Sequence, residues 1–326
     1  MKKRLGVIGV GIGGSYGTRI HQNPRAELVA ICARSLDKLQ KRKLLYNNEI
    51  GANPNLYVDV DEMIEKENLD GVIVATPSST HHEIAIKAIQ AGLAVLVDKP
   101  VDINIENIIK IKTALEISPV PFGVIYPLRF HSIYRGFKDL VEQKKLGRSL
   151  ICDLRLKWFR DQAYYDKGGW KGTWAYDGGG SLMNQGAHPL DLLCWLFGRP
   201  VKILGDFSHL AHNIETEDWA SAIVEFSSGV KCTITTTTCA KFIDGDQICF
   251  DYHSENGSIT LVNGVVLEGK DFLNENPSPF AHPVEDFIDA LVQDRKPFIG
   301  LEEATYSVEL INGIYRSARE GKCVYP

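Results

Sequence analysis

The chain has 326 residues, of which 44% are hydrophobic and 24% charged, so it is too long for one compact core and its composition is that of a globular protein. Its formal net charge of −5 provides no basic surface for nucleic acid, and no apolar run reaches the length of a membrane span. The seven cysteines are scattered and include no Cys-x-x-Cys pair. We therefore expect reduced thiols, no metal site and a cytoplasmic location.

The N-terminal segment predicts a dinucleotide site. Residues 4–10 form a short apolar run, a glycine-rich loop follows, and residues 28–32 form a second apolar run. In this strand–loop–helix–strand setting, Gly9 allows a tight turn, Gly11 lets a pyrophosphate approach, and Gly14 permits close helix–strand packing. The helix start then offers free N–H groups to the phosphates. The residues expected to bind the cofactor here are Gly9, Gly11, Ile12, Gly13 and Gly14.

The residues after the second strand bear on the choice of cofactor. NAD-binding sheets usually carry an acidic residue there that binds the ribose hydroxyls. This chain has Ala33-Arg34-Ser35 instead, so no carboxylate would repel a 2′-phosphate. Arg34 can pair with that phosphate and Ser35 can donate to it. We expect NADP to be preferred over NAD, while a simple stacking of Arg34 on the adenine would let both bind.

Strands and helices continue to alternate up to residue 125, which predicts a doubly wound parallel sheet and a Rossmann domain over residues 1–125. Ligands of such sheets bind at the carboxyl ends of the strands. The side chains that follow the predicted strands at 70–75, 94–97 and 122–125 are therefore candidates for cofactor or substrate binding. They are Thr76, Pro77, Asp98, Lys99 and Tyr126.

Residues 126–326 predict a second domain of the α+β class. Residues 150–158 alternate between apolar and polar types, and further strand-like runs follow, joined by the hairpin turns Ser227-Ser228-Gly229 and Glu255-Asn256-Gly257. This pattern indicates a large, open and mostly antiparallel sheet. Its exposed face suggests self-association as a homo-oligomer, either a dimer or a tetramer.

Two stretches of the second domain contain candidate site residues. In the segment from Asp177 to Asp191, three glycines precede Asn184 and His188, whose spacing of four places them on one helix face. This arrangement suits acid–base chemistry on a hydroxyl, although a glycine-rich turn before a core helix would look the same. The segment 158–174 is rich in aromatic residues and donors and includes Arg160, Trp170 and Trp174. It suits a polyhydroxylated ring, or else an ordered packing loop.

Together these residues make the chain resemble the glucose–fructose oxidoreductase/inositol dehydrogenase (Gfo/Idh/MocA) family over nearly its whole length. The resemblance rests on the glycine loop, the run from Ala75 to His81, Asp98-Lys99-Pro100, the segment from Asp177 to Asp191, and the closing segment 282–291. It implies a Rossmann domain followed by an α/β domain, whose open sheet often mediates oligomerisation. It also implies a nicotinamide-dependent oxidoreductase.

The resemblance also implies roles for individual residues. The family's lysine corresponds to Lys99 and its histidine to His188, while Asn184 replaces the family's acid and Asp98 its glutamate. His188 would take the proton of a sugar or cyclitol hydroxyl while Lys99 donates to the same oxygen. His81 and Asp98 would belong to the cofactor site. Two alternatives stay open: a redox-assisted glycosidase or lyase that retains NAD, and a regulatory protein that binds NADP without catalysis.

Overall fold

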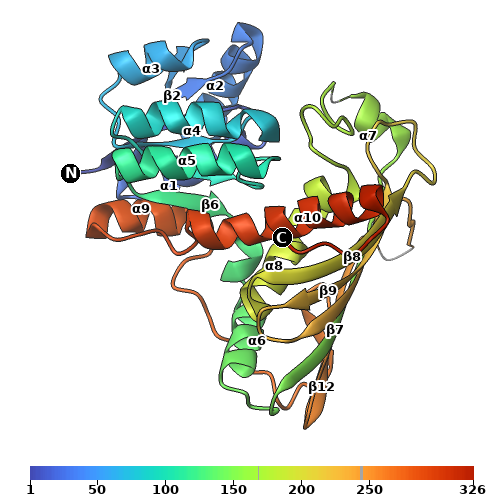
Figure 1. Ribbon diagram of the computed structural model, residues 1–326. Helices are drawn as coiled ribbons and strands as arrows, with labels where there is room; N and C mark the ends of the chain where they lie inside the picture. The colour runs from blue at the N-terminus through green and yellow to red at the C-terminus, as the bar shows by residue number, and fades with distance from the viewer. Residues whose placement is uncertain (168, 243–244) are drawn as a thin grey trace. The chain divides into compact units, whose positions relative to one another are not determined.

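The structure is a computed structural model that describes residues 1–167, 169–242 and 245–326 (Figure 1). It divides into two compact units. Unit 1 comprises Met1–Tyr126 and Phe280–Glu302, and unit 2 comprises Pro127–Pro279 and Glu303–Pro326. The division predicted from sequence, a single boundary after residue 125, differs from this because residues 280–302 return to unit 1.

The sheet of unit 1 has six parallel strands in the order β3-β2-β1-β4-β5-β6, so the predicted doubly wound parallel sheet is confirmed. The strand order reverses beside β1, which makes the β1 and β4 loops neighbours at the edge where such folds bind ligands. The strands are β1 (Lys3–Ile8), β2 (Ala26–Cys32), β3 (Asn55–Tyr57), β4 (Gly71–Val74), β5 (Ala94–Asp98) and β6 (Phe122–Ile125).

Helices cover both faces of this sheet. On one face α4 packs between α3 and α5, and on the other face α1, α2 and α9 contribute to one hydrophobic core (Figure 1). The helices are α1 (Gly13–Gln22), α2 (Leu36–Ile50), α3 (Val60–Lys66), α4 (His81–Gln90), α5 (Ile105–Ile117) and α9 (Pro283–Gln293).

The return of α9 to unit 1 follows from its apolar face. Val284, Phe287 and Ile288 are fully buried and belong to one core cluster with Leu5 and Val7 of β1. Burying each of these α9 side chains stabilises the unit by roughly 1.5–3 kcal/mol. A helix far along the chain therefore closes the face that α1 and α2 leave partly open.

Unit 2 contains a seven-stranded sheet in the order β13-β12-β11-β7-β10-β9-β8. All its pairings are antiparallel except that of β7 with β10, so the prediction of a large, mostly antiparallel sheet is confirmed. The strands are β7 (Ser149–Lys157), β8 (Pro200–Ser208), β9 (Trp219–Phe226), β10 (Lys231–Thr237), β11 (Gln247–Ser254), β12 (Gly257–Val262) and β13 (Val265–Glu268).

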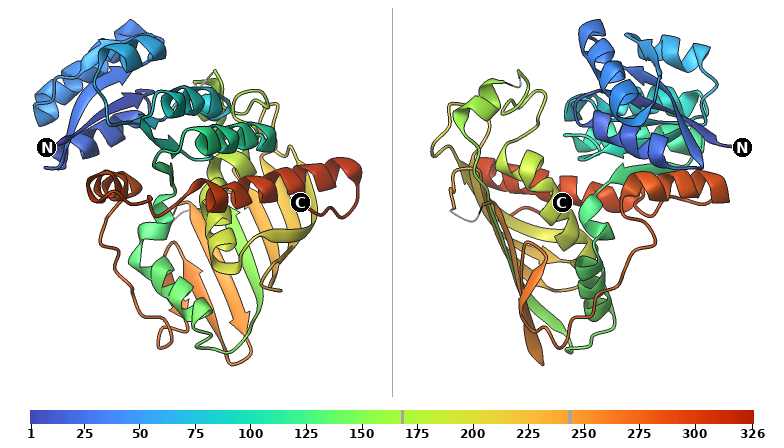
Figure 2. Two further views of the ribbon diagram at one scale, coloured as in Figure 1. Left: turned by 60° about the vertical axis from the view of Figure 1, so that its left-hand side comes forward. Right: turned by 180° about the vertical axis from the view of Figure 1, so that it is seen from behind.

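Helices lie on one face of this sheet only, within the part of the chain that the structure describes (Figure 2). The rings of Phe137 on α6 (Ser132–Glu142) and Phe197 on α8 (Ala187–Phe197) lie 5.2 and 6.0 Å from the ring of Tyr252 in β11. The third helix, α10 (Leu301–Glu320), packs on β8, where a Cβ on Gly205 would lie 2.8 Å from Ile314. The opposite face presents the alternate residues of each strand to solvent.

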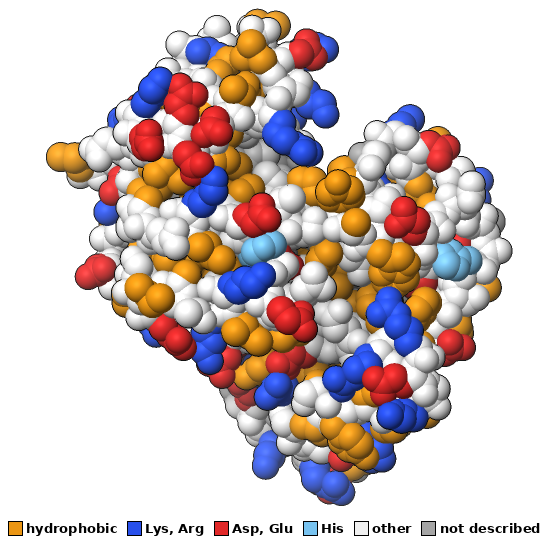
Figure 3. Space-filling model, turned by 45° about the horizontal axis from the view of Figure 1, so that its top comes forward, with side chains coloured by type: hydrophobic (Ala, Val, Ile, Leu, Met, Phe, Trp, Pro, Cys, Tyr) orange, Lys and Arg blue, Asp and Glu red, His pale blue; other side chains and the backbone are white. Residues whose placement is uncertain are grey.

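The face of the molecule drawn in Figure 3 has no large region of a single charge. Basic and acidic side chains are interspersed over the face in Figure 3, with hydrophobic side chains between them. Within the described residues, none of the helices combines the length and the apolar character needed to cross a bilayer.

Candidate active site

The glycine loop after β1 has the geometry that a dinucleotide requires. Gly9 has a φ of +99°, and a Cβ there would lie 2.2 Å from the carbonyl oxygen of Ala75, so only glycine fits this turn. A Cβ on Gly11, in contrast, would meet nothing within 4 Å. The space above Gly11 fits the close approach of a pyrophosphate, and Ile12 beside it is 60% exposed.

The third glycine of the fingerprint packs differently from expectation. A Cβ on Gly13 would lie 3.0 Å from Val7, so Gly13 makes the close helix–strand contact that was expected of Gly14. Gly14 instead packs against α2, where a Cβ would lie 2.3 Å from the guanidinium of Arg42. Arg42 donates to the carbonyl of Val10 at 3.1 Å. Sequence analysis missed Arg42 because it lies inside a helix, away from any motif.

The three residues directly after β2, Ala33, Arg34 and Ser35, include no carboxylate. Arg34 is exposed, and Ser35 caps α2 by accepting a hydrogen bond from the Lys38 N–H at 3.4 Å. A serine hydroxyl that accepts in this way still has its own proton to donate. The pair therefore offers a guanidinium and an O–H donor at the end of β2.

The loops after β4 and β5 are tied together by His81. Its Nδ1 and Nε2 lie 2.9 Å from the carbonyl oxygens of Pro100 and Thr76, and the side chain is 1% exposed. Thr80 adds a hydrogen bond to the Thr76 hydroxyl at 2.8 Å, and Pro77 accepts from the N–H of Thr80. His81, expected at the cofactor, is thus a buried support for the loops, and both ring nitrogens are occupied by the chain itself.

Asp98 and Lys99 lie at the carboxyl end of β5. The Asp98 carboxylate is 8% exposed and accepts from the Lys99 N–H at 2.8 Å and from the hydroxyl of Tyr16 on α1. Burial raises the pKa of Asp98, while the nearby charges of Lys99 and His81 oppose that rise. Tyr16, which carried no sequence signal, thus fixes the carboxylate beside the lysine. Tyr126, after β6, is fully buried.

In unit 2, Asn184 is held by a buried carboxylate. Its Nδ2 donates to both oxygens of Asp177, at 2.9 and 3.0 Å, and the N–H of Gly172 donates to Asp177 at 3.0 Å. Asp177 is 2% exposed. Because the amide nitrogen faces Asp177, the carbonyl oxygen of Asn184 is directed away from that carboxylate.

The triple glycine approaches the protein's own backbone. A Cβ on Gly180 would lie 1.8 Å from the carbonyl oxygen of Glu217, so this contact requires a glycine. The buried Glu217 carboxylate accepts from the N–H groups of Gly180 and Leu182 at 2.9 and 2.8 Å. Burial raises its pKa to about 7. Sequence analysis missed Glu217, which positions the start of the segment that carries Asn184.

Asn184 and His188 lie on either side of a change in helix geometry. We predicted one continuous helix, but residues Ser181–Gln185 form a π-helical turn, closed by a bond from the N–H of Gly186 to the carbonyl of Ser181 at 2.8 Å. Helix α8 starts after this turn, with His188 as its second residue. The wider turn changes the relative direction of the two side chains from that of an ordinary helix.

Aromatic and basic side chains gather in the segment before Asp177. The Arg160 guanidinium pairs with Asp246 at 2.8 Å and lies over the rings of Trp158 and Tyr164, with its carbon 4.9 and 5.5 Å from their centroids. Lys171 lies on Tyr164, with its Nζ 3.6 Å from the ring centroid. Tyr164 and Lys171 belong to the segment 158–174 that the sequence marked as rich in aromatic residues and donors, although only Arg160, Trp170 and Trp174 were singled out there.

The two tryptophans expected to bind substrate lie in different settings. Trp174 packs against Tyr315 and Phe207 at 5.1 and 5.9 Å between ring centroids, with Arg319 5.1 Å above it. This packing matches the alternative of an ordered loop. Trp170 is half-buried, and its carbonyl accepts from the Thr173 hydroxyl at 2.6 Å.

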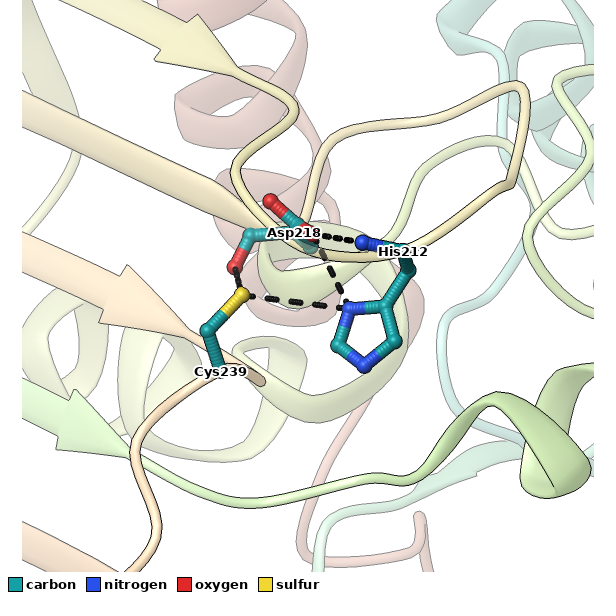
Figure 4. A group of neighbouring side chains, drawn as sticks. All are labelled: His212, Asp218 and Cys239. Atoms are coloured by element: carbon teal, nitrogen blue, oxygen red, sulfur yellow. Dashed lines mark hydrogen bonds and ion pairs between the residues drawn. The ribbon is translucent and has the colours of Figure 1, made fainter.

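Three potential metal ligands, His212, Asp218 and Cys239, have ligand atoms within 4.8 Å of one another (Figure 4). Asp218 is already occupied, because it accepts from the N–H groups of residues 210, 211 and 212 and from the His212 ring. The other ring nitrogen of His212 lies 2.7 Å from the carbonyl oxygen of Arg160. The group therefore anchors the loop before β9 to the segment that carries Arg160.

Family models match both parts of the chain. Residues 3–126 match the model described as the oxidoreductase family with an NAD-binding Rossmann fold, and residues 134–260 match the GFO/IDH/MocA C-terminal domain. Together these matches cover most of the chain.

Individual relatives agree with these family matches. The crystal structure of the WlbA dehydrogenase from Bordetella pertussis, in complex with NADH and UDP-GlcNAcA, is 28% identical, with a TM-score of 0.89 over 100% of this chain and 99% of that one. Glucose-6-phosphate 3-dehydrogenase from Bacillus subtilis is 25% identical over 89% of this chain and 87% of its own. The scyllo-inositol 2-dehydrogenase (NAD(+)) of the same organism is 22% identical over 98% and 94%. This chain belongs to the GFO/IDH/MocA family of NAD-binding oxidoreductases.

Proposed function

We propose that the protein is a nicotinamide-dependent dehydrogenase or reductase that transfers hydride between the cofactor and a hydroxyl-bearing carbon of a sugar, a sugar derivative or a cyclitol. Its family membership supports this, as do the substrates in the names of its relatives: glucose 6-phosphate and scyllo-inositol for the two Bacillus enzymes. The UDP-linked sugar bound to the Bordetella enzyme adds nucleotide-linked sugars to the candidates.

The proposed roles follow the chemistry of each side chain. Bound nicotinamide supplies the hydride acceptor or donor. His188 takes the hydroxyl proton during oxidation and returns it during reduction. Lys99 donates a hydrogen bond to the same oxygen and stabilises its developing negative charge. Asn184 orients the hydroxyl, while Tyr126 and Trp170 are proposed to line the substrate site.

The observation that carries the proposal is the buried Asp177 that holds Asn184. Its carboxylate is 2% exposed, and both of its oxygens accept hydrogen bonds from the Asn184 side chain. Burying a carboxylate costs free energy, and a helix that served only for packing would not need one beside an amide. The arrangement fixes the direction of a polar side chain four residues before His188, which a site acting on a hydroxyl requires.

Substitution of the two proposed catalytic groups tests the function. Lys99→Met and His188→Asn should each lower kcat/KM for sugar oxidation by roughly 100- to 10,000-fold, the range typical of positioned acid–base groups. Lys112→Met is the matched control, because Lys112 is exposed on α5. Wild-type turnover in either catalytic variant would contradict the proposal.

The same assay separates the two alternatives when sugar products are followed by chromatography beside the nicotinamide absorbance. Dehydrogenation changes both signals. Sugar conversion without net cofactor reduction would instead indicate the redox-assisted glycosidase or lyase. Tight cofactor binding without conversion of any sugar would indicate a regulatory protein.

We further propose that NADP is preferred over NAD. The exposed Arg34 and the hydroxyl of Ser35 support this, because they offer a cation and a donor where NAD-specific sheets have a carboxylate. Arg34→Ala should lower kcat/KM for NADP while leaving that for NAD nearly unchanged. If the wild type had equal kcat/KM for NADP and NAD, and Arg34→Ala changed both equally, Arg34 would only stack on the adenine and the NADP preference would be refuted.

We also propose that the protein is a homo-oligomer, a dimer or a tetramer, that associates through the outer face of the seven-stranded sheet. Apolar side chains on this face support the proposal: Ile151, Leu204 and Ile223 are 47%, 47% and 58% exposed. Light scattering after chromatography measures the mass. Ile223→Lys should shift it toward the monomer, and a monomeric wild type would refute this assignment.

A cytoplasmic location is likewise a proposal. It is supported by the seven cysteines, all of which are free thiols and five of which are buried. Disulfide-forming compartments would oxidise the two that are partly exposed, Cys239 and Cys323. Fractionation of the native cells tests it.

A further inference from the structure

Two cationic side chains of unit 2, Lys171 and Arg160, lie over the ring of Tyr164. The ammonium of Lys171 lies 3.6 Å from the centroid of the Tyr164 ring, and the Arg160 guanidinium carbon lies 5.5 Å from it. Lys171 is half-buried, and no described residue accepts a hydrogen bond from its Nζ. An ammonium has three N–H donors and no acceptor, so among the described residues these donors have no hydrogen-bond acceptor.

The Tyr164 hydroxyl is also set as a donor. Its oxygen accepts from Nε2 of Gln185 at 3.4 Å and from the Arg160 side chain. Gln185 is 3% exposed, so it holds the phenol from the protein interior. With its lone pairs directed at these donors, the hydroxyl has its own proton available for a further acceptor. Among the described residues, no hydrogen bond uses this proton.

Arg160 and Lys171 differ in their ion pairs. Asp246 pairs with Arg160 at 2.8 Å, whereas the described residues give Lys171 no salt bridge. Asp177 accepts hydrogen bonds from Asn184 and Gly172. Burial lowers the pKa of Lys171, the charge of Asp177 opposes this shift, and the charge of Arg160 adds to it. A carboxylate bound here would pair with the Lys171 ammonium and accept from both donors.

We propose that Lys171 and Tyr164 bind the carboxylate of a sugar-acid substrate, while Arg160 holds the Tyr164 side chain in position. This inference rests on the proposed oxidoreductase function and narrows its substrate class to sugars that carry one carboxylate. The position of the cluster supports it, because Asp177 joins the cluster to Asn184 and Gln185 directly follows Asn184. A substrate that reaches Asn184 with a hydroxyl would therefore come near this anion site.

Three sugars that differ only at C6 provide the test: glucose, glucuronate and glucose 6-phosphate. UDP-glucose and UDP-glucuronate provide the same comparison for nucleotide-linked sugars. Equilibrium binding is measured by calorimetry on protein loaded with reduced cofactor, in which a sugar hydroxyl cannot be oxidised. We expect the uronate to bind about 10- to 100-fold more tightly than its neutral counterpart, in the free or the UDP-linked pair, as two hydrogen bonds to a charged group imply.

Variants locate the preference. Lys171→Met should abolish it while leaving the affinity for the neutral sugar unchanged, and Lys171→Arg should keep most of it. Tyr164→Phe should weaken uronate binding by about 10-fold, because one charged hydrogen bond is lost. Lys167→Met is the control, since Lys167 is exposed on the same segment and has no role in the cluster. Circular dichroism confirms that each variant is folded.

The outcomes distinguish this inference from the function on which it rests. Equal binding of neutral and carboxylated sugars, or a uronate preference that survives Lys171→Met, overturns the carboxylate site even if sugars are oxidised. Tighter binding of glucose 6-phosphate than of glucuronate also overturns it. A uronate preference that depends on Lys171, with no oxidation of any sugar by the wild type, upholds the anion site and counts against the dehydrogenase.

Discussion

Removing one partner of the buried ion pair between Arg129 and Asp191 should strongly destabilise unit 2. Arg129 and Asp191 are 1% and 0% exposed, and the guanidinium donates to both carboxylate oxygens, at 2.8 and 2.7 Å. Glu303 accepts a third hydrogen bond from Arg129 at 2.7 Å, and the guanidinium carbon lies 5.5 Å from the Trp195 ring. Arg129→Met would keep the packing volume but leave Asp191 buried without its cation.

The magnitude follows from the cost of the uncompensated charge. Removing one partner of a buried, hydrogen-bonded pair typically lowers the free energy of unfolding by about 3–5 kcal/mol. Burial already raises the pKa of Asp191 against the field of Arg129, so the variant should escape part of the cost by protonating the carboxylate at low pH. With a urea m-value of about 2–3 kcal/mol per molar, the unfolding midpoint should fall by about 1–2.5 M at neutral pH.

Intrinsic fluorescence makes the assay specific. The five tryptophans of the chain, at positions 158, 170, 174, 195 and 219, all lie in unit 2, so urea unfolding followed by their emission reports that unit alone. Asp191→Leu and the double variant complete a cycle, in which the double variant should lose several kcal/mol less than the sum of the single losses. A loss below about 1 kcal/mol for Arg129→Met, or additive losses in the cycle, would refute this account of the pair.

Three further predictions concern the glycine loop and two buried ionisable groups. Gly9→Ala should destabilise unit 1, because the new Cβ would lie 2.2 Å from a backbone oxygen. Gly11→Ala should unfold like the wild type but bind the cofactor more weakly. Unfolding curves and cofactor titrations check both variants. Burial raises the pKa of Glu217 to about 7. Its stabilising effect is therefore complete below pH 4.5, and the free energy of unfolding falls by up to about 3 kcal/mol as the pH rises to 7. In Glu217→Gln, unfolding followed by tryptophan emission should not show this fall. Burial lowers the pKa of His282 to about 4, so its contribution to the stability of unit 1 is present above pH 6.5 and is lost as the pH falls to 4. His282→Asn should still accept the hydrogen bond from the Val284 N–H at the start of α9. It should remove the acid sensitivity of hydrogen exchange in that helix.

The Rossmann sheet was predictable because its signals are local. Each central strand is a short apolar run buried on both faces, as in Gly71–Val74, and such runs need no knowledge of their partners to be recognised. The hairpins of unit 2 were predictable for the same reason, since the turns at Ser228-Gly229 and Asn256-Gly257 join neighbouring antiparallel strands. Turn chemistry and alternation act over a few residues, so sequence alone carries them.

The return of α9 to unit 1 could not be predicted from its own residues. Periodicity shows that Val284, Phe287 and Ile288 share a face that must be buried, but it does not name the surface that buries it. The partners, Leu5 and Val7, lie at the other end of the chain. A domain boundary drawn from composition therefore assigned this helix to the domain that surrounds it in sequence.

The polar contacts of the candidate site were the least predictable part. Glu217 lies more than thirty residues from the N–H groups it accepts from, and Tyr16 lies on a different element from Asp98. Neither residue type nor spacing marks a side chain as the support of a distant loop. The π-helical turn before α8 is equally hidden: it follows the close contact of Gly180 with the backbone of Glu217, which no helix propensity indicates.

These supports explain why Asn184 is compatible with an active site. Both oxygens of the buried Asp177 accept from its side-chain nitrogen at 2.9 and 3.0 Å. An aspartate at position 184 would place a second carboxylate against the first, and two carboxylates at that distance cannot both ionise. Asparagine satisfies Asp177 as a donor and holds its direction at every pH at which Asp177 is charged. In this chain the amide is therefore the side chain that the neighbouring carboxylate requires, and under the proposed function the acid–base role belongs to His188.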